Sequence, residues 1–73
     1  MNFRTRLLSI LTLHLGNLST FNLQQVYQVA EGPMSFHYPN NNTVDASIRH
    51  NLQKLRDEGF LTFVDDEGTY QWV

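Results

Sequence analysis

Cysteine is absent from the sequence of 73 residues, which excludes disulfide bonds and any metal site built on thiolates. A chain this short that has no disulfide depends on a single hydrophobic core for its stability. Hydrophobic residues make up 41% of the sequence, which is enough for one modest core. We therefore expect one domain over residues 1–73, and the lack of cysteine fits a reducing, cytoplasmic compartment.

Long hydrophobic runs are also missing, since none approaches the roughly 20 residues of a membrane-spanning helix. Arg4 and Arg6 precede an apolar stretch at residues 7–13 that superficially looks like a secretory signal. Ser9 and Thr12 interrupt this stretch, and no small-residue cleavage site follows it. We therefore assign the segment to the first helix of the fold and expect no membrane partner.

Positive charge is scarce, because five Lys and Arg residues stand against seven Asp and Glu residues, a formal net charge of −2. Since proteins bind phosphate with basic side chains, this balance alone argues against a nucleic-acid partner. However, Arg49, Lys54 and Arg56 fall within one short stretch, whereas acidic residues gather after it, above all at 65–67. The sequence therefore predicts one positive face and one negative face.

Apolar residues recur at helical spacing through residues 7–15, which predicts a first helix. We expect Gly16 to end this helix in the left-handed conformation that glycine adopts easily. A second helix is expected to begin at Asn22, because Asn22 and Gln25 have the spacing of a capping box. The Gly-Pro pair at 32–33 is expected to end it.

A third helix follows a predicted loop at residues 34–42, where Pro39 and three consecutive asparagines favour turns. Asn42 or Thr43 is expected to cap this helix, and Gly59 to end it. Its buried stripe is predicted from four apolar residues at helical spacing: Val44, Ile48, Leu52 and Leu55.

The remaining residues have the alternation of β-strands, at 61–64 and 69–73, with a hairpin turn between them. Tyr70 and Trp72 alternate along the last strand, so we expect both to pack on the core. The residues 17–21 form a link or a short strand. This order predicts an α+β fold of the winged helix-turn-helix type, with three helices, a C-terminal β-hairpin wing and a third helix that enters the major groove of DNA.

The stretch from Ile48 to Phe63, Ile-Arg-His-Asn-Leu-Gln-Lys-Leu-Arg-Asp-Glu-Gly-Phe-Leu-Thr-Phe, resembles part of a known family, as does Gly-Thr-Tyr at 68–70. It is similar to the C-terminal winged-helix domain of the DpnI-type restriction endonucleases, also called Dam-replacing proteins. The opening of the second helix, Phe-Asn-Leu at 21–23 with Val26 and Tyr27, matches that family too. The resemblance covers roughly residues 21–73.

The resemblance implies a bacterial restriction-modification function. Members of the family cut DNA whose adenine is methylated in the GATC context, and they carry a separate N-terminal nuclease domain. Their winged helix binds double-stranded DNA and helps to read the methyl group. This sequence departs from the family at the wing. The wing tends to be basic in the family, whereas in this sequence its turn carries Asp65, Asp66 and Glu67. Such a turn repels phosphate.

Nine residues in and just before the third helix are candidates for DNA contact: Asn41, Asn42, Thr43, Ala46, Ser47, Arg49, His50, Gln53 and Lys54. Arg49 and Gln53 lie one turn apart. Arginine can form paired hydrogen bonds with guanine, and glutamine can form them with adenine. A solvated polar helix face is the alternative reading. His50 and Lys54 are candidates for phosphate contact, and His50 also for base contact.

Small side chains at Ala46 and Ser47 let a helix approach base edges, and an alanine methyl can meet a methyl group on a base. Alanine is also simply a good helix former. The residues 41–43 can hold a phosphate at the helix start, or they can serve only as turn and cap. Arg56 can meet the DNA backbone or pair with a nearby acid.

Catalysis, metals and cofactors find no support in the sequence. A metal-dependent nuclease needs a carboxylate-x-Lys pair, but the sole lysine, Lys54, follows Asn51-Leu52-Gln53. The three histidines are scattered and lack the spacing of a metal site. We expect a monomeric DNA-binding module without enzymatic activity of its own. The alternative is a winged helix that binds a basic protein through its acidic wing.

Overall fold

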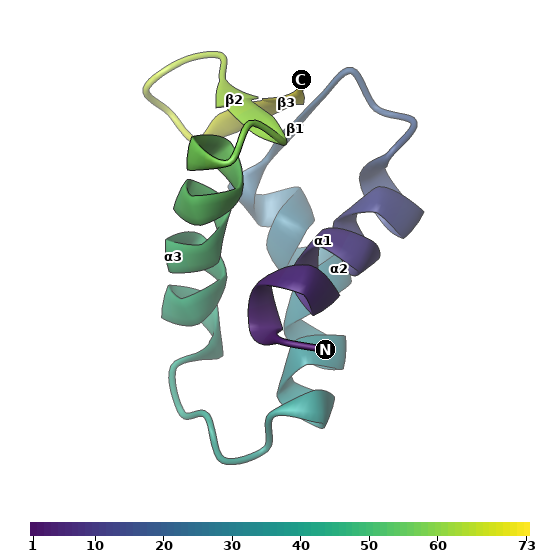
Figure 1. Cartoon of the computed structure of the whole chain (residues 1–73), viewed down its shortest axis with the longest axis vertical. Helices are drawn as coiled ribbons and strands as arrows, with labels where there is room; N and C mark the ends of the chain where they lie inside the picture. Colours follow the sequence, from purple (N-terminus) through teal and green to yellow (C-terminus); the bar gives the residue numbers. More distant parts are fainter.

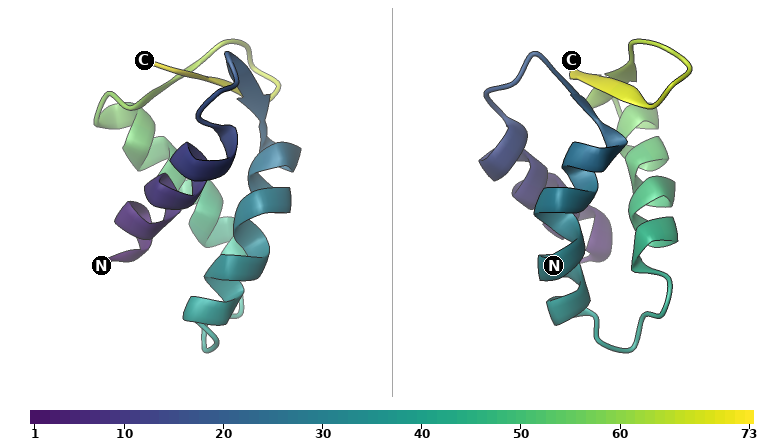
Figure 2. Two further views of the ribbon diagram at one scale, coloured as in Figure 1. Left: turned by 90° about the vertical axis from the view of Figure 1, so that its right-hand side faces the viewer. Right: turned by 180° about the vertical axis from the view of Figure 1, so that it is seen from behind.

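Three helices and three short strands make up the structure, a computed structural model that describes residues 1–73 (Figure 1). The elements follow the chain as α1 (Phe3–Leu15), β1 (Thr20–Asn22), α2 (Leu23–His37), α3 (Val44–Asp57), β2 (Leu61–Phe63) and β3 (Thr69–Trp72). The helices pack on one another, and the sheet lies at one end of the bundle (Figure 2). The predicted winged helix-turn-helix fold is confirmed.

The core draws on every one of these elements. Its thirteen buried residues are Leu7, Leu11, Leu15, Phe21, Val26, Ala30, Met34, Val44, Ile48, Leu52, Leu55, Leu61 and Tyr70. No charged side chain is among them, so no buried ion needs a partner. The stripe predicted for α3 is buried in full, and it packs against α1, α2 and β2.

The ends of α1 follow local side-chain chemistry, with one difference from expectation. The Asn2 side chain caps the helix by accepting a hydrogen bond from the Thr5 N–H at 2.8 Å. Gly16 does follow the last residue, but its φ of −63° is right-handed, so the predicted left-handed conformation was wrong. Glycine is required there for another reason, because a Cβ at this position would collide with the carbonyl oxygen of Thr12.

The second helix begins as predicted and ends later than predicted. Asn22 and Gln25 exchange backbone-to-side-chain hydrogen bonds, both at 2.9 Å, in a complete capping box. The Gly-Pro pair at 32–33 does not end α2, which continues to His37. Proline removes one helical hydrogen bond, but burial of Met34 and the bond from the Tyr38 N–H to the Met34 carbonyl oxygen hold the last turn. The predicted loop 34–42 therefore shrinks to residues 38–43.

The end of α3 sets the direction of the chain into the wing, which we define as β2, β3 and their turn, residues 61–72. Gly59 has a φ of +90°. Its N–H donates to the Arg56 carbonyl oxygen, and the Phe60 N–H donates to the Leu55 carbonyl oxygen, both at 3.0 Å. This pair of bonds is the Schellman motif, which favours glycine at the left-handed position. The prediction that Gly59 ends the helix is confirmed.

The sheet is antiparallel with the order β1-β3-β2, so the last strand lies in the middle. Tyr70 stands opposite Phe21 on one side and Phe63 on the other. Trp72 is half-buried, and its indole N–H donates to the Leu15 carbonyl oxygen at 3.1 Å. Both aromatic residues of β3 therefore pack on the core, as predicted, and Trp72 fastens the sheet to the end of α1.

Replacing Leu52 by alanine should strongly destabilise the domain, because a cavity would open at the centre of the α3 stripe. The expected loss is about 2–5 kcal/mol in the free energy of unfolding, a large share of the roughly 4–11 kcal/mol typical of a domain this size. Chemical denaturation measures it. Leu13→Ala is the matched control, since Leu13 is 79% exposed. Equal effects of the two substitutions would contradict the assignment of the core.

Candidate nucleic-acid interface

The outer face of α3 carries most of the candidate DNA-contacting residues. Because the apolar stripe points into the core, Arg49, His50 and Gln53 lie on the opposite side of the helix and are exposed. Ala46 is half-buried on that same face, and Lys54 is exposed. No other helix or strand covers this side of α3 (Figure 1). The sequence-predicted residues of the helix are therefore brought together on one accessible surface.

The basic side chains divide into engaged and free ones. Arg4 pairs with Glu58 at 2.9 Å, and Arg56 pairs with Asp57 at 3.3 Å. Arg6 lies within hydrogen-bonding distance of the Tyr38 hydroxyl and the His37 ring.

The two remaining cations, Arg49 and Lys54, form no ion pair and no side-chain hydrogen bond. Both stand on α3. An overall acidic chain thus keeps its only unengaged Arg and Lys side chains on the helix that was expected to meet DNA, where they can neutralise phosphate.

The start of α3 is held by Asn41 and not by the predicted caps. Thr43 occupies the N-cap position, but its side chain makes no capping hydrogen bond, and Asn42 makes none either. The Asn41 side chain instead accepts from the Thr43 N–H at 2.8 Å and donates to the Ser47 hydroxyl at 3.1 Å. An Asx turn that precedes the helix replaces the expected cap. Asn41 and Ser47 therefore have structural roles, whereas Asn42 and Thr43 remain exposed.

Arg56 shapes the junction of α3 and the wing. Besides its contact with Asp57, its guanidinium lies 4.6 Å from the centre of the Phe63 ring, a cation–π arrangement. Of the two roles considered for Arg56, contact with the DNA backbone and pairing with a nearby acid, the structure shows the second. The stacking of Arg56 on Phe63 was not expected. The two residues lie on different elements, a helix and a strand, so no periodic pattern in the sequence indicates that they meet.

The wing turn is acidic, and one of its carboxylates is part of its framework. Asp65 accepts hydrogen bonds from the backbone N–H of Glu67 at 2.8 Å and of Thr69 at 3.3 Å. The hydrogen bond from the Glu67 N–H holds the pKa of the Asp65 carboxyl below its ordinary value of 3.8; desolvation opposes this effect, and hydrogen bonds from Thr69 add to the lowering. The turn therefore keeps its negative charge, and it is not built to contact a phosphate.

The chain matches the sequence model of one protein family, described as the Dam-replacing HTH domain, over residues 3–72. It belongs to that family. The Dam-replacing HTH domain is a DNA-binding helix-turn-helix module, not a catalytic one, and double-stranded DNA is its partner. No curated protein matches the chain significantly.

Two further properties of the molecule bear on its partners. None of the helices combines the length and the apolar character needed to cross a bilayer. The structure also contains no group of three or more histidine, aspartate or glutamate side chains placed to hold a metal ion.

Asn41→Ala should lower the free energy of unfolding by about 1 kcal/mol, as loss of a capping side chain typically does. The cause is loss of the three hydrogen bonds by which the Asn41 side chain holds Thr43 and Ser47 and fixes the turn before α3. Asn42→Ala is the control, because the exposed Asn42 side chain bonds to nothing. Thermal unfolding of both variants measures the difference. A destabilisation by Asn42→Ala equal to that by Asn41→Ala would show that the turn is not held as described.

Asp65→Ala should make the domain less stable at neutral pH but not in strong acid. Because the pKa of Asp65 is lowered by folding, its stabilising effect is present above the unfolded value near 3.8 and disappears as the pH falls through the folded value. Unfolding measured from pH 7 down to pH 2 should show the two stability curves converging. A constant gap over this range would mean that the carboxylate charge is not what the turn amides bind.

Proposed function

We propose that this domain reads GATC-type sites in duplex DNA whose adenine is methylated, as the specificity domain of a restriction endonuclease with a separate nuclease domain. Membership of the Dam-replacing HTH domain family supports this reading. The observation that carries it is the placement of the two unengaged cations, Arg49 and Lys54, on the uncovered face of α3. Such a helix can enter a major groove with phosphates on either side.

The nine candidate residues take different roles in this proposal. Arg49 and Gln53, one turn apart on the exposed face, contact base edges, as arginine and glutamine do with guanine and adenine. Ala46 lies one turn earlier, where its small side chain leaves room for a methylated base. His50 and Lys54 contact phosphates, and so do Asn42 and Thr43 at the start of the helix. Asn41 and Ser47 act by holding that turn in place.

Because its wing is acidic, this domain divides its DNA contacts differently between the third helix and the wing than a winged helix with a basic wing does. Asp65, Asp66 and Glu67 would be repelled by a phosphate backbone. Docking therefore relies on α3 and the turn before it, and the wing stays off the backbone. A small positive face makes few phosphate contacts, so affinity should depend modestly on salt and base contacts should matter more.

Binding to three short duplexes tests the proposal: GATC with both adenines methylated, the same site unmethylated, and a scrambled control. Fluorescence anisotropy at low and near-physiological salt gives the affinity of each. Arg49→Ala should weaken binding to the methylated site by roughly 5- to 150-fold, the range of about 1–3 kcal/mol for a base contact. Lys54→Ala should weaken binding to all three duplexes alike, and it should reduce the slope of log affinity against log salt concentration by about 0.9.

Arg4→Ala serves as the control for charge, because it removes one positive charge from α1, where Arg4 is already paired with Glu58. Its effect should be small. Equal binding of the three duplexes would leave a DNA-binding module without methyl reading. Absence of binding to any duplex at low salt would overturn the proposal.

A further inference from the structure

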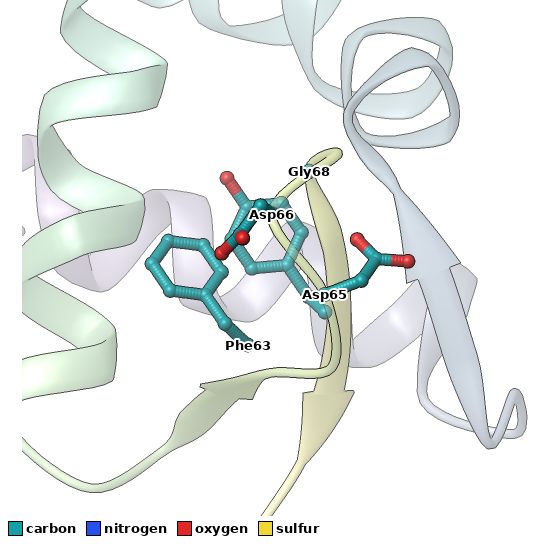
Figure 3. A pocket seen from close by; sticks show the side chains of 5 residues that line it. Phe63, Asp65, Asp66 and Gly68 are labelled. Carbon is teal, nitrogen blue, oxygen red and sulfur yellow. The ribbon is translucent and has the colours of Figure 1, made fainter.

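A pocket of about 290 Å³ opens on the wing, and none of the proposed base-reading residues of α3 lines it. It is lined by Phe63, Asp65, Asp66, Gly68 and Tyr70 (Figure 3). The rings of Phe63 and Tyr70, with centres 5.2 Å apart, give it an aromatic wall. The two aspartates bring negative charge to its rim. We call it the wing pocket, and its chemistry is that of an aromatic surface beside carboxylates.

The two aspartates of the wing pocket differ in what their carboxylates do. Asp65 is engaged by the backbone of its own turn, and in Figure 3 its carboxylate points away from Phe63. Asp66 accepts no hydrogen bond and forms no ion pair, and its carboxylate is turned towards the space beside the Phe63 ring (Figure 3). The wing pocket therefore contains one free anionic group next to an aromatic ring.

Phe63 already attracts a cation within this molecule. The Arg56 guanidinium lies over one face of its ring, and the charge of Arg56 is countered by Asp57. The side chain of Phe63 is nevertheless 39% exposed, so part of the ring remains open to a second group. Aromatic faces bind organic cations through their quadrupole, and a nearby carboxylate adds to this attraction.

We infer that the wing pocket binds the ammonium group of a lysine side chain, methylated or not, from a basic segment of another protein. A lysine side chain is slender, and the wing pocket lies at the lower end of the size range of ligand sites. A nucleic acid is disfavoured, because Asp66 and Glu67 would face its phosphates. This inference does not depend on the proposed reading of methylated DNA.

The test uses the whole chain labelled with ¹⁵N and titrated with three short peptides at low salt. Each peptide has one central lysine flanked by glycines, either unmodified, trimethylated or acetylated. The first two should shift the amide signals of residues 63–70 with saturation, because both carry a positive charge. The acetylated peptide should leave these signals in place, because its side chain is neutral.

Phe63→Leu and Asp66→Asn should each weaken binding of the trimethylated peptide by about two- to five-fold, the range expected for a cation–π contact or a surface charge pair. Glu67→Gln is the matched control. It removes the same charge from the same turn, but Glu67 does not line the wing pocket. Its effect should be clearly smaller. Asp66→Asn alters only an exposed side chain, so it remains informative if Phe63→Leu impairs folding.

Three results would overturn the inference. The first is an equal response to the acetylated peptide, and the second is an equal loss for Glu67→Gln and Asp66→Asn, which would indicate charge attraction without a pocket. The third is a titration in which N6-methyladenosine moves these signals and the lysine peptides do not, which would assign the pocket to a base. Failure of DNA binding in the anisotropy experiment leaves the inference untouched.

Discussion

Burial of a single apolar stripe on α3 determines which residues of that helix are exposed to solvent. Once Val44, Ile48, Leu52 and Leu55 are withdrawn from water against α1, α2 and β2, the rotation of α3 about its axis is fixed. Each such side chain gains about 1.5–3 kcal/mol from burial, so rotating the helix would be costly. Arg49, His50 and Gln53 face outwards as a direct result. The core therefore sets which side of α3 carries the candidate DNA-contacting residues.

Much of this architecture could be predicted from the sequence, because the decisive signals are local. Helical spacing located the α3 stripe, the Asn22–Gln25 pair marked the start of α2, and Gly59 marked the end of α3. The prediction that the Gly-Pro pair at 32–33 ends α2 was wrong. A helix can continue past such a pair when the residues after it can be buried in the core. Met34 has a place in the core, and no local pattern reveals that.

The interface was less predictable, for a reason of the same kind. Three basic residues close together in the sequence suggested one positive face, but the structure separates them. Arg56 turns to Asp57 and Phe63, while Arg49 and Lys54 stay free. Which side chains remain unengaged depends on neighbours distant in the sequence. The wing pocket has the same origin, since it arises only when β2 and β3 pair and bring Phe63 beside Tyr70.

The position of β3 in the middle of the sheet has a consequence for how the domain folds. Neither β1 nor β2 has a strand partner until residues 69–72 have been synthesised, although β1 comes before α2 and α3. Thr20 pairs with Gln71, so closing the sheet joins segments that are separated in the sequence by α2, α3 and β2. Such a non-local pairing carries an entropic cost that helices do not. We therefore expect a growing chain to form helices first and to acquire its sheet in one late step.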